Sequence, residues 1–271
     1  MIEKREDRIL VEEVIIAGHS QPITLRSYLP SRRGVPLPIV LYFHGGCFVS
    51  GAPEDVGVPA IFIAHNIPAW VISVGYSLSP SFPFPAALED GYRALKWVVS
   101  NARANGADSD RLAVAGHDAG GNIATCLAAI IRDRGEFQLS AQAILAPLID
   151  PSMTRLVKGI GDNKIDLSVQ EARDCYRAYL PKISQRLHPY AAPIESRRLA
   201  NLAPTMIASA EHDIYRGEAE QYAAALIEAG VPIEMTRYAN TTHQEIARHS
   251  ATLYDMVRFF NRIFSDQPHS G

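Results

Sequence analysis

One glycine-rich segment carries an acidic side chain at a position suited to nucleophilic chemistry. Residues 116–121, GHDAGG, follow the small-x-nucleophile-x-small pattern of a nucleophile elbow, with Asp118 at the centre. Small residues are needed there because the central residue occupies a strained turn that lifts its side chain above a sheet. The N–H of Ala119 follows at a helix N-terminus, where the partial positive charge favours an anion. We therefore take Asp118 as the first candidate catalytic residue and Ala119 as a candidate oxyanion donor.

A second segment offers further backbone donors. Residues 43–48, FHGGCF, follow a continuous apolar run, and a loop of this form supplies N–H groups to an oxyanion hole. We expect these donors to be Gly45 and Gly46. His44 is interpreted as a structural support of the loop. Two sets of donors are thus predicted to converge on one point above the sheet.

These motifs resemble those of hormone-sensitive-lipase-type carboxylesterases and acetyl hydrolases of the α/β-hydrolase fold, over nearly the whole chain. The matching segments are His44 to Gly46, residues 75–90, residues 116–122, residues 210–213 and His243. The resemblance implies that Asp213 is the acid that orients His243, and that His243 is the base. The chain order is then elbow, acid, histidine, as in α/β hydrolases generally.

The chain departs from this family at the elbow, where Asp118 replaces the serine and His117 replaces a residue that is usually acidic. An aspartate with an ordinary pKa of ~3.9 is already ionised at neutral pH and needs no base to attack. Attack on an ester carbonyl would give a high-energy mixed anhydride. A carboxylate is better suited to an sp³ carbon that bears a halide or an epoxide oxygen, with His243 then activating the hydrolytic water.

Several functions therefore remain open. Our first prediction is a hydrolase on a carboxylesterase-type scaffold that acts on a small, largely apolar, ester-like substrate, because the His-Gly-Gly loop suits a carbonyl oxyanion. The second is an aspartate-nucleophile hydrolase resembling epoxide hydrolases and haloalkane dehalogenases, with Tyr176, Tyr179 or Tyr190 as leaving-group donor. The others are direct water attack with Asp118 as general base, a non-catalytic binding protein, and an engineered Ser-to-Asp variant.

The elements that must position these residues alternate along the chain. Apolar runs predict strands, and helical spacing of apolar residues predicts helices between them, which favours a mostly parallel sheet with helices on both faces. The expected strands cover residues 9–16, 22–29, 38–43, 69–75, 111–115, 141–145, 205–208 and 233–238. The expected helices cover residues 55–65, 86–102, 122–131, 218–229 and 246–263.

The fold class predicted is therefore α/β, with the α/β-hydrolase fold implied by the resemblance. We expect residues 1–271 to form a single domain, with residues 150–182 as a cap insert over the C-terminal edge of the sheet, where open α/β sheets bind ligands. The late strand over residues 233–238 could pair edge to edge with a second copy, which suggests a homodimer.

Composition excludes several other classes of function. The formal net charge is −3 and no dense block of Lys and Arg occurs, so we expect no nucleic-acid partner. Three cysteines in no metal-ligand spacing predict neither a disulfide framework nor a metal site, and the implied triad needs no cofactor. Residues 56–88 lack charge but contain five prolines, so we expect no membrane span. The charged N-terminus carries no visible signal peptide, which predicts a cytoplasmic protein.

Overall fold

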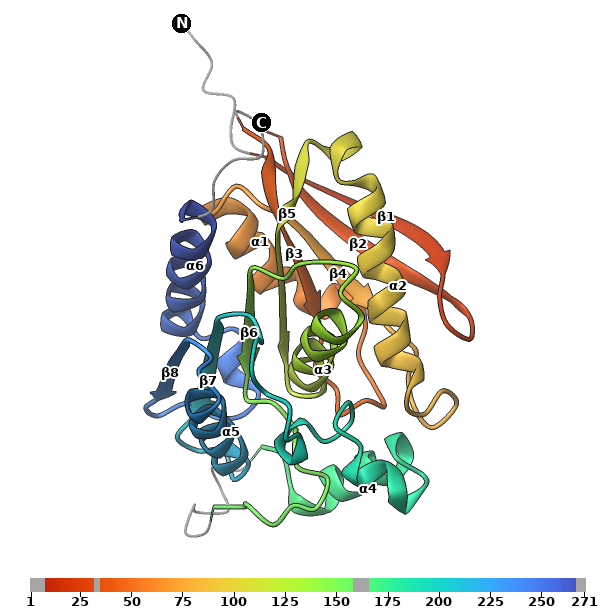
Figure 1. Cartoon of the computed structure of the whole chain (residues 1–271), viewed down its shortest axis with the longest axis vertical. Coiled ribbons are helices and arrows are strands. Elements are labelled where there is room, and N and C mark those ends of the chain that lie inside the picture. The colour runs from red at the N-terminus through yellow and green to blue at the C-terminus, as the bar shows by residue number, and fades with distance from the viewer. Residues whose placement is uncertain (1–7, 32–34, 158–165, 267–271) are drawn as a thin grey trace, which may run out of the picture.

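The computed structural model describes residues 8–31, 35–157 and 166–266, and its centre is one eight-stranded sheet (Figure 1). The strand order is β1-β2-β4-β3-β5-β6-β7-β8. Strand β2 is antiparallel to both of its neighbours, β1 and β4, and all the other strand pairs are parallel. The strands are β1 Ile9–Ala17, β2 Pro22–Pro30, β3 Leu37–Phe43, β4 Trp70–Gly75, β5 Ala107–His117, β6 Ala141–Leu145, β7 Thr205–Ala210 and β8 Ile233–Tyr238.

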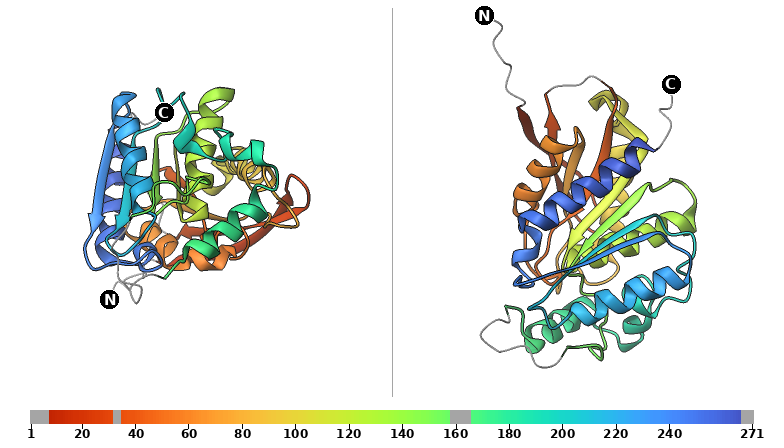
Figure 2. Two further views of the ribbon diagram at one scale, coloured as in Figure 1. Left: turned by 90° about the horizontal axis from the view of Figure 1, so that it is seen from below. Right: turned by 90° about the vertical axis from the view of Figure 1, so that its left-hand side faces the viewer.

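Helices cover both faces of the sheet, as the alternating pattern predicts. The helices are α1 Gly57–Asn66, α2 Ala86–Asn101, α3 Ala119–Arg134, α4 Val169–Tyr179, α5 Arg216–Glu228 and α6 Ser250–Ser265. The residues of α2, α3 and α5 share one apolar cluster, and those of α1 and α6 share the other. The views from below and from the side show these layers on opposite sides of the strands (Figure 2).

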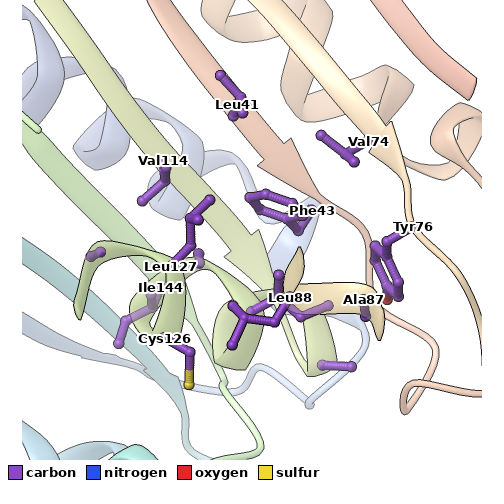
Figure 3. Packing of buried hydrophobic residues seen from close by; sticks show 14 of the residues in the cluster. Leu41, Phe43, Val74, Tyr76, Ala87, Leu88, Val114, Cys126, Leu127 and Ile144 are labelled. Atoms are coloured by element: carbon purple, nitrogen blue, oxygen red, sulfur yellow. The ribbon is translucent and has the colours of Figure 1, made fainter. Parts of the chain in front are cut away.

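Strand β3 shows why the two clusters form. All seven of its residues are buried, because parallel strands in the middle of a sheet lie between two helical layers. Its alternate side chains Leu41 and Phe43 join the cluster of α2, α3 and α5, where they pack among Val74, Val114 and Leu127 (Figure 3). Val40 and Tyr42 point to the other face and join the cluster of α1 and α6. This strand ends directly before the His-Gly-Gly loop, so its burial fixes where that loop begins.

Several element boundaries differ from the prediction; β5, for example, begins at Ala107 and not at residue 111. The helix expected over residues 55–65 is a short 3-10 helix, Pro53–Val56, followed by α1 from Gly57. The elbow is tighter than the six-residue turn expected over residues 116–121. Strand β5 continues through His117 and α3 begins at Ala119, so Asp118 alone separates strand from helix.

The segment predicted as a cap, residues 150–182, includes α4, which lies at the lower end of the molecule in Figure 1. The α4 residues Ala172, Tyr176 and Tyr179 join the apolar cluster of α2, α3 and α5. Residues 158–165 of the predicted cap lie outside the described residues, as do residues 267–271 of the expected loose tail. Strand β8 stands at one end of the sheet order, which is the position that the predicted homodimer requires. The dimer itself stays a prediction.

Candidate active site

Asp118 occupies a strained turn between β5 and α3. Its backbone has φ 57° and ψ −122°, a conformation that L-residues rarely adopt and that the surrounding structure must hold in place. Close backbone contacts hold it. A Cβ added to Gly116 would lie 2.2 Å from the carbonyl oxygen of Gly120, and one added to Gly120 would lie 2.1 Å from that of Phe43. The two glycines are therefore required for the turn, and the turn presents the Asp118 side chain above the sheet.

The carboxylate of Asp118 sits on two backbone donors of the loop after β3. The N–H groups of Gly46 and Cys47 each donate to its Oδ2 with N···O distances of 2.7 Å, at the short end for charge-assisted hydrogen bonds. Gly46 and Cys47 have φ values of 110° and 52°, and successive N–H groups in such turns point to a common side and bind anions. The donors aimed at Asp118 thus include the expected Gly46.

Gly45, the other donor expected from this loop, has a different role in the geometry. A Cβ at Gly45 would lie 2.9 Å from His117 Nδ1 and 3.3 Å from Asp118 Oδ2, so this glycine allows the loop to approach the elbow closely. Sequence reasoning missed Cys47, whose contribution depends on a positive φ at a non-glycine residue. Ala119 is the first residue of α3, so its N–H is one of the helix's first-turn donors that have no intrahelical acceptor.

His44 supports the loop. Its ring stacks on that of Tyr76 with centroids 4.2 Å apart and an interplanar angle of 14°. The Tyr76 hydroxyl donates to the His44 carbonyl oxygen at 2.9 Å, and His44 Nδ1 lies 2.6 Å from the Gly45 carbonyl oxygen, to which it donates. These contacts fix the path of the chain as it leaves β3.

Asp213 and His243 come together from the loops that follow β7 and β8. His243 Nδ1 donates to Asp213 Oδ2 at 2.9 Å, and the N–H of Tyr215 donates to Asp213 Oδ1 at 2.8 Å. His117 Nε2 donates to the backbone oxygen of His243 at 2.8 Å, which ties the elbow to the histidine loop. Both side chains of the Asp213–His243 pair are buried. The histidine is therefore held in one orientation, with Nε2 directed toward Asp118.

His243 Nε2 lies 3.5 Å from Asp118 Oδ1 and makes no hydrogen bond with any described residue, so the contact is a charge pair. Burial opposes protonation of His243, but the carboxylates of Asp213 and Asp118 outweigh it and hold the histidine pKa well above its usual value. Burial would raise the pKa of Asp118, yet His243 and the Cys47 N–H lower it below its ordinary range. This arrangement favours an imidazolium between two carboxylates.

The predicted leaving-group donors divide into two kinds. Tyr176 and Tyr179 on α4 are buried, and among the described residues their hydroxyls have no hydrogen-bond partner. Burial raises the pKa of Tyr176 well above its usual value, and the charges of Glu218, Asp150 and Asp118 add to this. Both groups are therefore neutral phenols, able to donate. Tyr190 instead donates to Asp133 Oδ2 at 2.6 Å, so its hydroxyl is already committed.

The described residues show neither a metal-ligand cluster nor a membrane-spanning helix. Within them, no group of three or more His, Cys, Asp or Glu side chains is arranged to hold a metal ion. None of their helices combines the length and the apolar character needed to cross a bilayer.

Comparison with known proteins shows that the chain is similar to esterases. A family model described as the α/β-hydrolase fold matches residues 40–247. The esterase LipI of Mycobacterium tuberculosis H37Rv is 36% identical over 238 residues, covering 86% of this chain and 74% of the relative. An esterase of the archaeon Pyrobaculum calidifontis superposes with a TM-score of 0.85 at 35% identity, over 94% of this chain and 85% of that one. The metagenomic carboxylesterase EstE1 gives 0.88 at 30% identity, over 97% and 92%.

Proposed function

Since the chain belongs to the α/β-hydrolase family, in the branch of carboxylesterase-type enzymes, we propose that it is a hydrolase whose nucleophile is the Asp118 carboxylate. The substrate we propose is a small, largely apolar molecule with an electrophilic sp³ carbon, such as an epoxide or an alkyl halide. The reaction passes through an alkyl ester on Asp118.

The observation that carries this proposal is the position of Asp118 Oδ2. It accepts the N–H groups of Gly46 and Cys47, the same donors that would otherwise stabilise the oxygen of an attacked ester carbonyl. A substrate carbonyl oxygen has no free place on these donors while the carboxylate is there. Oδ1, in contrast, faces His243 across a 3.5 Å charge pair and makes no bond to the loop backbone, so it is the oxygen available for attack.

The first step forms a bond between Oδ1 and the substrate carbon and breaks the bond from that carbon to the leaving group. An epoxide oxygen leaves as an alkoxide and requires a proton donor. The neutral hydroxyls of Tyr176 and Tyr179 suit this role, since they are buried on α4 and unpartnered among the described residues. The ring of Phe48 stacks on that of Tyr179 at 3.9 Å, which supplies an apolar surface next to the loop.

Alkylation of Asp118 changes the state of His243. The ester carries no charge, so one of the two carboxylates that raise the histidine pKa is lost and this pKa falls. His243 then releases its proton, which replaces the one that the tyrosine gave to the epoxide oxygen, and acts as base on a water that attacks Cγ of the ester. The negative charge that develops on Oδ2 is stabilised by hydrogen bonds from the N–H groups of Gly46 and Cys47. Cleavage of the Cγ–Oδ1 bond releases the alcohol, which keeps the Oδ1 oxygen and takes up the proton held by His243, and the water oxygen replaces Oδ1 in the restored carboxylate.

A second candidate is favoured by the comparisons, because the relatives that match over most of the chain are named as esterases. In that case Asp118 serves as general base for direct attack of water on an ester carbonyl. The carbonyl oxygen would then bind at a place other than the N–H groups of Gly46 and Cys47, which Asp118 occupies. The two reactions differ in the fate of the water oxygen.

A single turnover in ¹⁸O-water, with styrene oxide as probe and enzyme in excess, distinguishes them. If Asp118 is the nucleophile, the label enters the Asp118 carboxylate, found by mass spectrometry of its peptide, and the first diol carries none. Label in the product but not in Asp118 would overturn the nucleophile and indicate direct water attack. Absence of turnover with epoxides and halides, together with ester hydrolysis that is lost in Asp118→Ala, would support the second candidate.

A further inference from the structure

The peptide group between His243 and Gln244 is hydrogen-bonded on both sides by segments far from it in the sequence. At the elbow, His117 Nε2 donates to its carbonyl oxygen at 2.8 Å. From the segment predicted as a cap, Asp166 Oδ2 accepts its N–H at 2.8 Å. The carbonyl oxygen of Asp166 also accepts from the Gln244 side-chain amide at 3.2 Å. This peptide adjoins the Cα of His243, so its two partners fix the backbone from which the imidazole projects.

Asp166 stands at an anchored point of the segment predicted as a cap. Its neighbour Leu167 is buried in the apolar cluster of α2, α3 and α5. Ser168 follows as the N-cap of α4, and its side chain accepts the N–H of Glu171 at 3.2 Å. Among the described residues, Asp166 Oδ1 is buried without a hydrogen-bond partner, so Gln244 is the one partner of this carboxylate. The Asp166 side chain is therefore committed to the loop of His243.

The same part of the chain also contacts the loop of Asp213. The carbonyl oxygen of Ser168 accepts the Tyr215 hydroxyl at 3.0 Å, and the Tyr215 N–H donates to Asp213 Oδ1 at 2.8 Å. Residues 166–168 thus bind sequence neighbours of both partners of Asp118. Their effect on the candidate site is exerted through the backbone of those two loops.

We propose that Asp166 is a positioning residue for His243, which fixes the peptide after the histidine and so holds the imidazole between Asp213 and Asp118. The inference deepens the proposed function and rests on it for the step that His243 performs. Asp166 touches no reacting atom. The predicted cap then has a second task besides covering the site, which is to keep the base in place.

The two steps of the proposed reaction should depend on Asp166 to different extents. Alkylation needs the Asp118 carboxylate, whose backbone donors Gly46 and Cys47 belong to the loop after β3 and not to the cap. Hydrolysis of the ester needs His243 within reach of the attacking water. A displacement of about 1 Å can cost a reaction ~10²-fold in rate. Loss of the Asp166 carboxylate should therefore slow the second step alone.

Rapid-quench mass spectrometry with styrene oxide measures both steps, as formation and decay of the adduct on the full chain. In Asp166→Ala we expect formation within about twofold of the unaltered chain and decay slowed about 10- to 100-fold. Asp166→Asn keeps an oxygen acceptor for the Gln244 N–H and should restore most of the decay rate. Equal slowing of both steps, or decay at the unaltered rate, would overturn the proposal.

Ser168→Ala is the matched control. It removes the N-cap hydrogen bond of α4 two residues from Asp166 but leaves both hydrogen bonds to Gln244. We expect it to keep both rates, so that a general loosening of the cap is distinguished from loss of the Asp166 contact. If circular dichroism shows that Asp166→Ala has lost its fold, Asp166→Glu takes its place, since the longer side chain keeps the charge but displaces the acceptor.

A second measurement needs no turnover and so separates this inference from the proposed function. The titratable groups that face His243 are Asp213 from the loop after β7, Asp118 and His117 at the elbow, and Tyr215 before α5. The two carboxylates hold the pKa of His243 above its usual value of ~6.5. A displaced ring loses part of this interaction, and its pKa then falls toward that value.

NMR titration of the His243 ring follows this change. Asp166→Ala should lower the pKa of His243, whereas Ser168→Ala should leave it as in the unaltered chain and Asp166→Asn should lower it less than Asp166→Ala. An identical titration in Asp166→Ala and the unaltered chain would overturn the positioning role. Failure of every variant to form an adduct would count against the proposed function, and the titration would still decide the role of Asp166.

Discussion

His243 lies between two carboxylates, with Nδ1 2.9 Å from Asp213 Oδ2 and Nε2 3.5 Å from Asp118 Oδ1. In a serine hydrolase the second of these positions belongs to a neutral hydroxyl, and the histidine must be unprotonated to accept its proton. Here the second carboxylate instead favours the imidazolium. The elbow residue therefore decides when the histidine can act as a base, and this relationship underlies the first three predictions.

Asp118→Ser should create esterase activity. The substitution frees the N–H groups of Gly46 and Cys47 for a substrate oxyanion and removes one of the charges that protonate His243. We expect hydrolysis of p-nitrophenyl butyrate to rise about 10²-fold over the unaltered chain, the range associated with oxyanion donors. Asp118→Ala is the control, since it frees the donors without adding a nucleophile. Equal rates for the two variants would contradict the prediction.

His243→Gln should trap the covalent intermediate. The first step needs only the Asp118 carboxylate, whereas hydrolysis of the ester needs the base. Intact-mass measurement after incubation with styrene oxide should show one adduct per chain, located at Asp118 by peptide mapping. Asp118→Asn,His243→Gln should give none. An adduct of equal yield in the double variant would place the alkylation elsewhere.

Stability should depend on pH through the Asp118–His243 pair. The lowered pKa of Asp118 contributes stability that is present above its unfolded value of ~3.9 and is lost as pH falls through the folded value. The raised pKa of His243 contributes stability that is complete below ~6.5 and is lost as pH rises through the folded value. The free energy of unfolding should therefore be highest between about pH 4 and 6.5.

Urea unfolding over a pH series measures this profile. Asp118→Asn should weaken the pH dependence of stability on both the acidic and the basic side, because it removes the Asp118 carboxyl and lowers the pKa of His243. Asp174→Asn is the control, since Asp174 is exposed on α4, where it pairs with Arg177 and accepts a hydrogen bond from Gln170 at 2.8 Å. A profile for Asp118→Asn that matches the unaltered chain would mean that the pair is not charged in the folded state.

Tyr176→Phe should slow the alkylation step and leave stability nearly unchanged. The hydroxyl makes no hydrogen bond to the described residues, so its removal breaks none, but a general acid contributes about 10²-fold or more to rate. The rate of adduct formation with styrene oxide in the His243→Gln background measures the effect. Tyr190→Phe is the matched control, as it loses the bond to Asp133 and should destabilise the chain without slowing alkylation. The reverse pattern would remove Tyr176 from the mechanism.

Gly120→Ala should lower the free energy of unfolding by about 3 kcal/mol. The added Cβ would lie 2.1 Å from the carbonyl oxygen of Phe43, so the backbone of the elbow or of the loop after β3 must move to make room. Gly57→Ala is the control, since its Cβ would meet only the Tyr28 hydroxyl at 3.7 Å in a helical conformation, and we expect a gain of about 0.5–1 kcal/mol. Urea denaturation compares the two. Equal effects would show that the elbow tolerates a side chain.

The sheet and its helices follow from local patterns, and so their prediction succeeds. Strand β3 is apolar at every position because both faces are covered, and a pattern of that kind is visible in sequence. The elbow glycines could be recognised in the sequence because they stand where two backbone segments come into contact. Asp213 and His243, the partners of Asp118, were predicted from the resemblance to a known family. The expectation of a mostly parallel sheet wrapped by helices is confirmed.

The details of the candidate site depend on contacts that sequence spacing does not contain. Cys47 donates to Asp118 because a non-glycine residue adopts φ 52°, which propensities do not predict. Tyr190 is excluded as a donor by a hydrogen bond to Asp133, 57 positions away. The charge state of His243 likewise depends on its distances to two carboxylates from different loops. Such features arise from tertiary packing between segments far apart in the sequence.

The two hydrogen bonds that Gly46 and Cys47 donate to Asp118 Oδ2 also affect which inhibitors can bind. Organophosphates and boronic acids inhibit serine esterases by forming an adduct with the hydroxyl and resting an oxygen on these donors. This chain has no hydroxyl at the elbow, and its own Asp118 carboxylate already occupies the two N–H donors. In an esterase, the carboxylic acid that the reaction releases can occupy the same donors. It should therefore resist such inhibitors and tolerate high concentrations of carboxylic acids that slow serine esterases.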